Sequence, residues 1–107
     1  MKGMPGGMQN LVKQANQMQN KMKKLQAELE EREYESTSGG GAVSVKVKGE
    51  TNLIELKIDE DVFKSGDVEM LQDMVLTAIN DVLKTAKEAG AAEMEKITGK
   101  LGMPGLF

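Results

Sequence analysis

An apolar stripe along the N-terminal part of the chain constrains the fold most strongly. Apolar side chains recur three and four positions apart, at Met8, Leu11, Ala15, Met18, Met22, Leu25 and Leu29. This heptad spacing predicts a helix from Met8 to about Glu33 with a narrow coiled-coil seam. About 26 residues at ~1.5 Å each give a helix of roughly 39 Å. A chain of 107 residues is too small to cover that length alone, so we expect the helix to pair with a second copy.

The segment from 43 to 58 has the two-residue period of a β-hairpin. Its apolar positions alternate with polar ones on both sides of a turn at 49–52, and they are Val43, Val45, Val47, Ile54, Leu56 and Ile58. One face of the hairpin is therefore expected to be buried. A lone hairpin is marginally stable in water, so this face should pack on a helix. Residues 33–38 can supply a third strand.

A second long helix is predicted after Gly66. Asp67 is a suitable N-cap, and Glu69 favours the positive end of the helix dipole. The apolar face that follows is wider than a coiled-coil seam, comprising Leu71, Met74, Val75, Ala78, Ile79, Val82, Leu83 and Ala86. Such a face can cover the sheet and contact a partner. Gly90 is expected to weaken the helix before Met94 and Ile97. These elements predict an α+β fold.

Glycine-rich segments divide the chain into one domain and two tails. The sequence Gly-Met-Pro-Gly occurs at residues 3–6 and again at residues 102–105, without helical or strand periodicity. We therefore expect residues 1–7 and 99–107 to be flexible tails around a single domain at residues 8–98.

Three short motifs favour structural roles over ligand binding. The glycines at 39–41 precede a strand and lack a following Gly-Lys-Ser or Gly-Lys-Thr, which indicates a hinge or hairpin loop rather than a phosphate cradle. The acidic triplet at 59–61 lies where a turn or short helix would begin, so capping is favoured. The glutamates at 28–35 lack the Asp/Asn and glycine pattern of a calcium loop.

Composition excludes several classes of function. The chain has no histidine and no cysteine, which removes histidine catalysis, thiol chemistry and the usual zinc or iron–sulfur ligands. We therefore expect no enzyme, no metal, no cofactor and no small-molecule substrate. There are only three aromatic residues, too few for a binder that stacks single-stranded bases. Without a long apolar segment or a secretory signal, we expect a cytoplasmic protein with no membrane partner.

The distribution of charge is more informative than its total. The formal net charge is −3, yet residues 1–27 contain five lysines and no acid. Residues 28–35 then carry five glutamates against Arg32 alone. One helix is therefore basic at its start and acidic at its end.

Lysine, asparagine and glutamine side chains gather on the acid-free part of this helix. With Met8 at heptad position a, Lys13 and Lys23 lie opposite the seam, whereas Lys21 and Gln14 flank it. Such side chains contact phosphates and sometimes base edges, although a solvated outer face of a coiled coil is the alternative. The candidate DNA-binding residues are Lys13, Gln14, Gln17, Asn20, Lys21, Lys23 and Lys24.

The order of motifs resembles that of a known family. The chain contains Leu-Val-Lys-Gln-Ala at 11–15, a glycine-rich loop, a hairpin, Asp-Val-Glu-Met-Leu at 67–71 and Asn80-Asp81. Together with both glycine–methionine tails, these segments resemble the YbaB/EbfC nucleoid-associated proteins over nearly the whole chain. The resemblance implies an α-β-β-β-α protomer, a tweezer-shaped homodimer and DNA binding in the nucleoid that bends or compacts DNA and affects gene expression.

Two hypotheses follow for the function. The first is a homodimeric architectural protein that binds double-stranded DNA through paired basic helices. The second is a coiled-coil adaptor that holds a protein partner without contacting DNA. Both need an apolar interface, which we predict at Leu11, Ala15, Met18, Met22, Leu25, Leu29, Met74 and Ile79.

Overall fold

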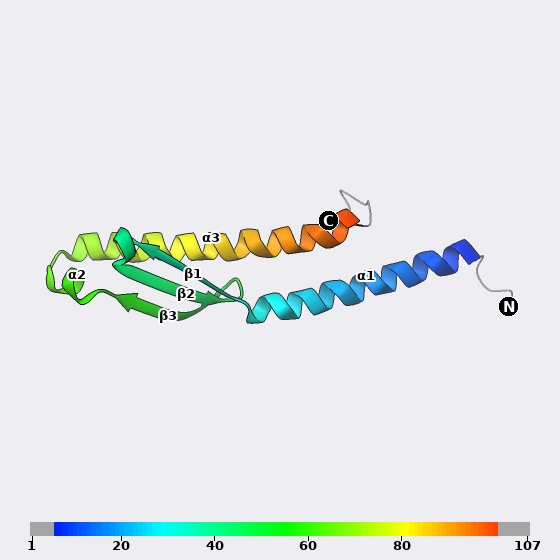
Figure 1. The fold of residues 1–107 in the computed structure, drawn as a ribbon, viewed down its shortest axis with the longest axis horizontal. Helices are drawn as coiled ribbons and strands as arrows, with labels where there is room; N and C mark the ends of the chain where they lie inside the picture. The colour runs from blue at the N-terminus through cyan, green and yellow to red at the C-terminus, as the bar shows by residue number, and fades with distance from the viewer. Residues whose placement is uncertain (1–5, 101–107) are drawn as a thin grey trace.

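The computed structural model describes residues 6–100 and confirms the predicted α+β fold (Figure 1). Its elements in chain order are α1 (Gly6–Glu31), β1 (Glu33–Ser38), a 3-10 turn η1 (Gly39–Gly41), β2 (Val43–Lys48), β3 (Asn52–Ile58), a short α2 (Glu60–Lys64) and α3 (Val68–Lys100). Residues 6, 7, 99 and 100, assigned to the tails from the sequence, are helical. The remainder of both predicted tails, 1–5 and 101–107, lies outside the described residues.

The molecule is a rod measuring 77 × 22 × 16 Å. The sheet and the first half of α3 form one end, called here the body (Figure 1). From the body, α1 projects alongside the second half of α3 in the antiparallel direction and extends past its end (Figure 1). We call α1 the arm.

The three strands form an antiparallel sheet in the order β1-β2-β3. In the register, Val45 pairs with Ser36 on one side and with Leu56 on the other. The inner face of β2 is completely buried, with Val43, Val45 and Val47 at most 1% exposed. Opposite these valines, α3 presents Ala78, Val82 and Ala86 at a spacing of four residues, so that one stripe of the helix meets the central strand.

The prediction that the apolar face of the hairpin is buried is confirmed for β2. It is wrong for β3 in a single protomer. Leu53, Leu56 and Ile58 are 44%, 51% and 37% exposed. A β-bulge opposite Lys46 and Val47 inserts Ile54 and places Leu53 on the same face as Leu56. The cause of the exposure is that α3 packs mainly on β1 and β2. A helix about 10 Å wide covers roughly two strands spaced ~4.8 Å apart, which leaves the third uncovered.

The outer face of the sheet is polar and carries charges of both signs. Lys46 lies between Glu33 and Glu55, with Nζ to carboxylate distances of 3.9 and 3.7 Å. Exposed pairs of this kind contribute little to stability. Their alternation gives this face no excess of positive charge, which distinguishes it from the arm.

The predicted turns and caps are confirmed. The three glycines of η1 have φ angles of 61°, 68° and 96°, which explains why this loop is glycine. Asp59 caps α2 by accepting from the Asp61 amide at 2.9 Å. Asp67 caps α3 by accepting from the Met70 amide at 3.0 Å. These acidic residues therefore have the structural role that the sequence favoured.

Gly90 does not interrupt α3, which is continuous to Lys100. Gly90 is buried, and a Cβ atom there would lie 2.9 Å from the Glu50 Oε1 atom of the β2–β3 turn. The small residue therefore allows the turn to approach the helix closely.

Candidate nucleic-acid interface

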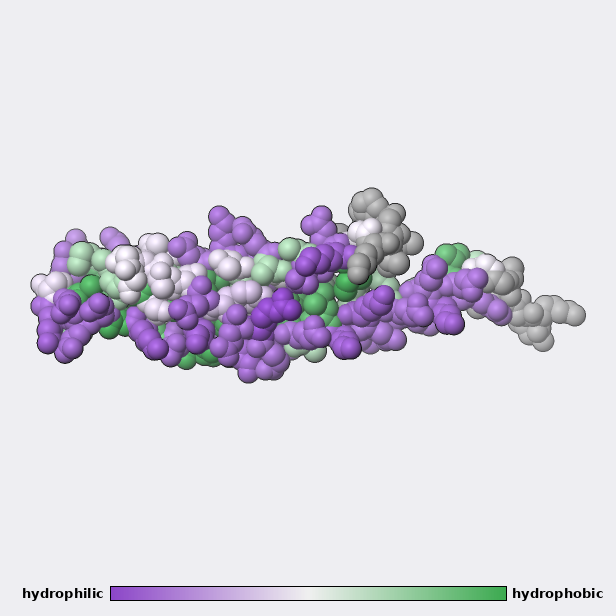
Figure 2. Space-filling view, in the orientation of Figure 1, coloured by the Kyte–Doolittle hydropathy of each residue, from purple (hydrophilic) through white to green (hydrophobic). Residues whose placement is uncertain are grey.

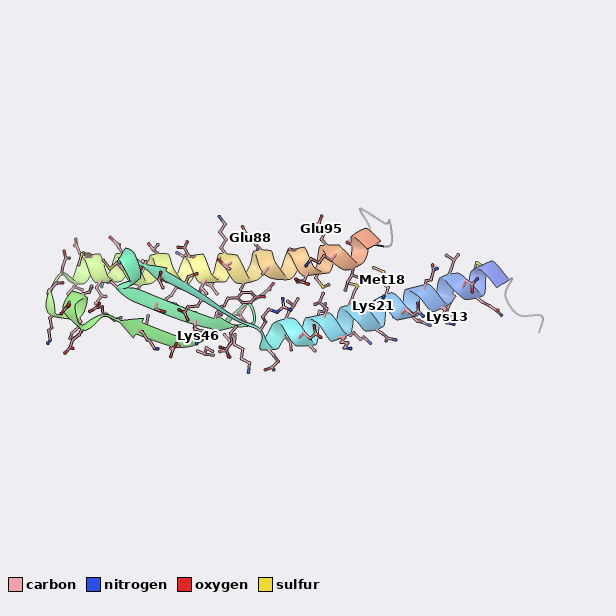
Figure 3. All side chains as sticks on the ribbon, in the orientation of Figure 1. Lys13, Met18, Lys21, Lys46, Glu88 and Glu95 are labelled. Atoms are coloured by element: carbon pink, nitrogen blue, oxygen red, sulfur yellow. The ribbon has the colours of Figure 1, made fainter. Side chains whose placement is uncertain are left out.

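The seam of α1 is divided between two environments. Met18, Met22, Leu25 and Leu29 are half-buried, whereas Leu11 and Ala15 are exposed. The half-buried part faces α3 of the same chain: Met18 and Leu25 line a cleft with Ile97, and Leu29 lines another with Gly90 and Met94. Figure 3 shows Met18 on the side of α1 that faces α3. Four of the six predicted interface residues on α1 are therefore partly covered without a second subunit.

The two predicted interface residues on α3 differ in their surroundings. Met74 packs against the core of the protomer, and its carbonyl accepts a hydrogen bond from the Ser38 hydroxyl at 2.6 Å. Ile79 also contacts the core but reaches an apolar depression bordered by Leu53 and Leu56. Only Ile79 is thus continuous with the uncovered face of β3. The assignment of all eight residues to a subunit interface stays a prediction.

The four lysines of the arm are exposed and free of ion pairs within residues 6–100. They are Lys13, Lys21, Lys23 and Lys24. By contrast, Lys46, Lys48, Lys57, Lys64 and Lys96 each lie within 4 Å of a carboxylate. Figure 2 shows hydrophilic residues along most of α1. The arm therefore presents positive charge that the described part of the protein does not neutralise.

The predicted DNA-binding residues fall into two groups. Gln14, Gln17 and Lys21 line a cleft of about 460 Å³ between α1 and α3. The other four residues lie on the arm outside this cleft, namely Lys13, Asn20, Lys23 and Lys24. Gln17 falls at heptad position c, away from the seam, yet it lines this cleft together with Met18. All seven side chains are exposed, and three of them also border this cleft, so their joint role in DNA binding stays a prediction.

Lys96 of α3 is a cleft residue that sequence reasoning missed. It lines the cleft with Lys21, and its ammonium group lies 3.2 Å from a carboxylate oxygen of Glu93. Its position depends on the antiparallel packing of α1 and α3, because 75 residues separate Lys21 from Lys96. Acidic and basic residues are mixed in the sequence around Lys96, so local charge did not indicate a phosphate-binding residue there.

The basic surface ends where α1 joins the body. Glu28, Glu30 and Glu31 are exposed there. The Lys48 ammonium lies 2.8 Å from Glu31 Oε2, and this hydrogen bond together with the carboxylate charge raises the pKa of Lys48. Arg32 Nη1 lies 3.8 Å from Glu93 Oε1. These acids would repel a polyanion, so favourable contacts are confined to the outer part of the arm.

The residue types on the arm suit contacts with a nucleic-acid backbone. Lysine ammonium groups neutralise phosphates, and asparagine and glutamine side chains donate hydrogen bonds to phosphate or base-edge oxygens. In the described part of the chain, no group of three or more acidic residues is arranged to hold a metal ion. Nor is any helix between residues 6 and 100 long and apolar enough to span a membrane.

A small sheet is covered by one long helix, and a second helix projects from it with lysines but no acid between residues 6 and 27, which defines a class of α+β proteins suited to contact a polyanion. The chain belongs to the YbaB/EbfC DNA-binding family, whose model matches residues 4–101. The resemblance seen in the sequence is therefore confirmed.

Individual relatives agree with this assignment. A nucleoid-associated protein of Clostridium novyi (strain NT) is 53% identical, over 98% of this chain and 94% of the relative. One from Clostridium acetobutylicum is 50% identical, over 97% and 94% respectively. The crystal structure of an uncharacterized protein from Helicobacter pylori has a TM-score of 0.69 at 26% identity, covering 89% of this chain and 98% of that chain.

Proposed function

We propose that this chain is a nucleoid-associated protein that binds double-stranded DNA as a homodimer, mainly by neutralising phosphates with its two arms. Binding changes the bending or compaction of the DNA and thereby influences gene expression. The family assignment supports DNA as the partner. The names of the relatives support a location in the nucleoid.

The observation that carries this proposal is the unpaired lysine set of the arm. A solvated helix face would normally mix acids with its lysines, because like charges along one helix repel one another. Lys46, Lys48 and Lys64 lie beside carboxylates, whereas residues 6–27 of the arm contain lysines and no acid. A duplex supplies the missing negative charge as a regular phosphate array. Arginine, the common reader of guanine, is absent from residues 6–27, so we expect weak sequence preference.

The uncovered face of β3 supports a homodimer. We call Leu53, Ile54, Leu56 and Ile58 the β3 strip; each is 37–51% exposed. Ile79 borders the strip, and Leu76, one helical turn away on α3, is 58% exposed. An isologous interface suits this strip because it is apolar and needs no complementary charge on the partner. Two copies would also present two arms, which doubles the number of lysines available to one duplex.

The same exposure supports a second candidate, an adaptor that holds another protein. Leu11 and Val12 of the arm are 56% and 44% exposed, and Figure 2 shows an apolar patch near the N-terminal end of α1. An amphipathic helix with such a stripe can dock in a partner's groove. This candidate differs from the first because it predicts no affinity for DNA.

A salt titration of duplex binding tests the proposal. Four arm lysines in each of two chains give up to about eight phosphate contacts, and each full contact contributes about −0.9 to the slope of log affinity against log salt. We expect a strongly negative slope that is similar for unrelated duplex sequences. A slope near zero, or tight binding restricted to one short sequence, contradicts the mechanism. No binding at low salt favours the adaptor.

A matched pair of charge variants locates the contact. Replacing Lys13, Lys23 and Lys24 together with glutamate should abolish duplex binding and leave the circular dichroism spectrum and melting temperature unchanged. Replacing Lys57, Lys64 and Lys84 with glutamate makes the same change in net charge away from the arm and should retain most of the affinity. Equal losses in both variants would show that net charge, rather than the arm, determines binding.

A further inference from the structure

The apolar seam of α1 continues beyond the part that α3 covers. Met8, Leu11 and Val12 are 48%, 56% and 44% exposed, whereas Met18 and Leu25 are half-buried against α3. We call Met8, Leu11, Val12 and Ala15 the arm-tip seam. Met8, Leu11 and Ala15 continue the heptad stripe of the covered seam, and Val12 lies beside them on the same helix. The open half of this apolar stripe is available to a second occupant.

The end of α3 lies beside the point where the covered seam stops. Ile97 lines the cleft that Gln14 and Met18 border from α1. The two helices run antiparallel, and α1 extends past the end of α3 (Figure 1). The last residue described in α3 is Lys100. The direction of α3 at its last described residue therefore points along α1, from Met18 toward Met8.

We propose that residues 101–107 of the same chain occupy the arm-tip seam. This segment, Leu-Gly-Met-Pro-Gly-Leu-Phe, has four apolar residues and no charged side chain. Gly102 and Pro104 are poor helix formers. Seven extended residues reach about 23 Å at ~3.3 Å each. The distance along α1 from Met18 to Met8 is only about 15 Å at ~1.5 Å per residue.

Charge favours this segment over the other available occupants. The arm of a second copy would bring another acid-free set of lysines beside this one, and like-charge repulsion opposes that pairing. A DNA phosphate would find no hydrogen-bond donor on the apolar side chains of the seam. Residues 101–107 have no charged side chain, so they bring neither like-charge repulsion nor an unpaired phosphate to the seam. They are also tethered to α3 beside α1, which gives them a high effective concentration.

The proposed contact leaves the lysine face of the arm available. Lys13 lies at heptad position f, on the side of α1 opposite Leu11 and Ala15. Covering the seam would therefore hold the arm tip in a water-shielded helix while its lysines stay exposed. The proposal does not depend on DNA binding, and it can fail or succeed without affecting the proposed function.

Disulfide trapping in the full chain tests the contact directly, because the protein contains no cysteine of its own. The test variant combines Leu11→Cys with Phe107→Cys, and the matched control combines Lys13→Cys with Phe107→Cys. Under mild oxidation at low protein concentration, we expect the test variant to form a disulfide within one chain at least tenfold faster than the control. Non-reducing electrophoresis and peptide mass spectrometry measure the product, and a thermal melt verifies that both variants fold.

Two results of the trapping experiment would overturn the proposal. Similar rates at Leu11→Cys and Lys13→Cys would mean random collision with the arm. A disulfide formed only between two chains would mean that another copy supplies the occupant.

Fluorescence gives an independent measurement without a disulfide. Phe107→Trp introduces the only tryptophan in the chain. If the segment is docked, adding Leu11→Ser should shift the emission to longer wavelength and raise acrylamide quenching at least twofold. Adding Lys13→Ser should change neither value. Emission and quenching equal to those of a free tryptophan peptide, and unaffected by Leu11→Ser, would contradict docking.

Discussion

The arm and the body differ in the ion pairing of their lysines and in the burial of their apolar side chains. In the body, most described lysines lie near carboxylates, and the apolar residues of β2 are fully buried. On the arm, Lys13, Lys21, Lys23 and Lys24 lack such partners among residues 6–100, and the apolar seam is at best half-buried. An unpaired set of like charges does not stabilise a helix. Stability should therefore depend on the body, and DNA binding on the arm.

The sharpest test places the same new residue in each region. Val45→Asp puts a carboxylate at a position that is 1% exposed, and we expect it to cost about 3 kcal/mol or more in the free energy of unfolding. Lys23→Asp on the exposed arm should change that free energy by less than about 0.5 kcal/mol. Urea unfolding followed by circular dichroism measures both. Comparable losses would mean that the arm is part of the cooperative core.

The next test separates the protomer's core from its proposed dimer surface. Leu56→Asp places a charge in the β3 strip, and we expect the dimer dissociation constant to rise at least tenfold because that charge would be desolvated at the interface. Lys57→Asp is the matched control, since residue 57 lies on the opposite face of the same strand. Analytical ultracentrifugation over a range of concentrations measures both. A Leu56→Asp dimer as tight as that of the control would exclude the strip as the interface.

The sequence predicted the elements of this fold well because their signals are local. Heptad spacing indicated α1, alternation indicated β2 and β3, and Asp59 and Asp67 were identified as caps from their neighbours alone. The burial of β3 could not be predicted in the same way. Alternation shows that Leu56 and Ile58 share an apolar face, but the width of a single helix determines whether that face is covered.

The candidate site was predictable only in part, for a similar reason. Helical phase placed Lys13 and Lys23 on the exposed side of the arm, and the structure agrees. Periodicity could not tell whether Met18 and Leu25 meet another chain or α3 of their own chain. Their contact with α3 depends on the turn at Arg32, which reverses the chain direction into β1, and that geometry also brings Lys96 into the cleft.

Two glycines lie where the arm joins the body, and alanine substitutions at them should change the free energy of unfolding in opposite directions. Gly49 has a φ of 68°, its amide donates to the Arg32 carbonyl at 2.8 Å, and a Cβ atom would lie 3.1 Å from the Glu30 carbonyl oxygen. Gly49→Ala should therefore cost about 1–2 kcal/mol in the free energy of unfolding. At Gly90→Ala the one close approach is to the flexible end of Glu50, and Leu29 Cδ1 at 3.9 Å is in ordinary contact. The helix propensity of alanine should therefore prevail and stabilise α3 by up to about 1 kcal/mol.

Urea unfolding of the two alanine variants tests this contrast of signs. Opposite signs of the change would indicate that the joint is fixed by the backbone near Gly49 rather than by the packing at Gly90. Destabilisation by Gly90→Ala equal to that of Gly49→Ala would instead show that Glu50 cannot move aside.

The smallest expected effect concerns the ion pair that connects the arm to the body. The Glu31 carboxylate raises the pKa of Lys48 above its ordinary value of 10.5, so folding favours the protonated ammonium. The resulting stability is fully present below that ordinary value and is lost as the pH rises through the raised pKa of the folded state. Glu31→Gln removes the charge of the carboxylate. The urea midpoint of this variant should therefore lie slightly below that of the parent protein at pH 7, and the gap should close at pH 11.

Glu28→Gln is the control for this experiment, because Glu28 lies one turn earlier on the same exposed surface and has no ion-pair partner in the described residues. Its midpoint should differ from that of the parent by the same amount at both pH values. The pair is exposed, so solvent screening keeps the effect small. A gap for Glu31→Gln that persists unchanged at pH 11 would mean that the Glu31 carboxylate stabilises the joint by some contact other than the Lys48 ammonium.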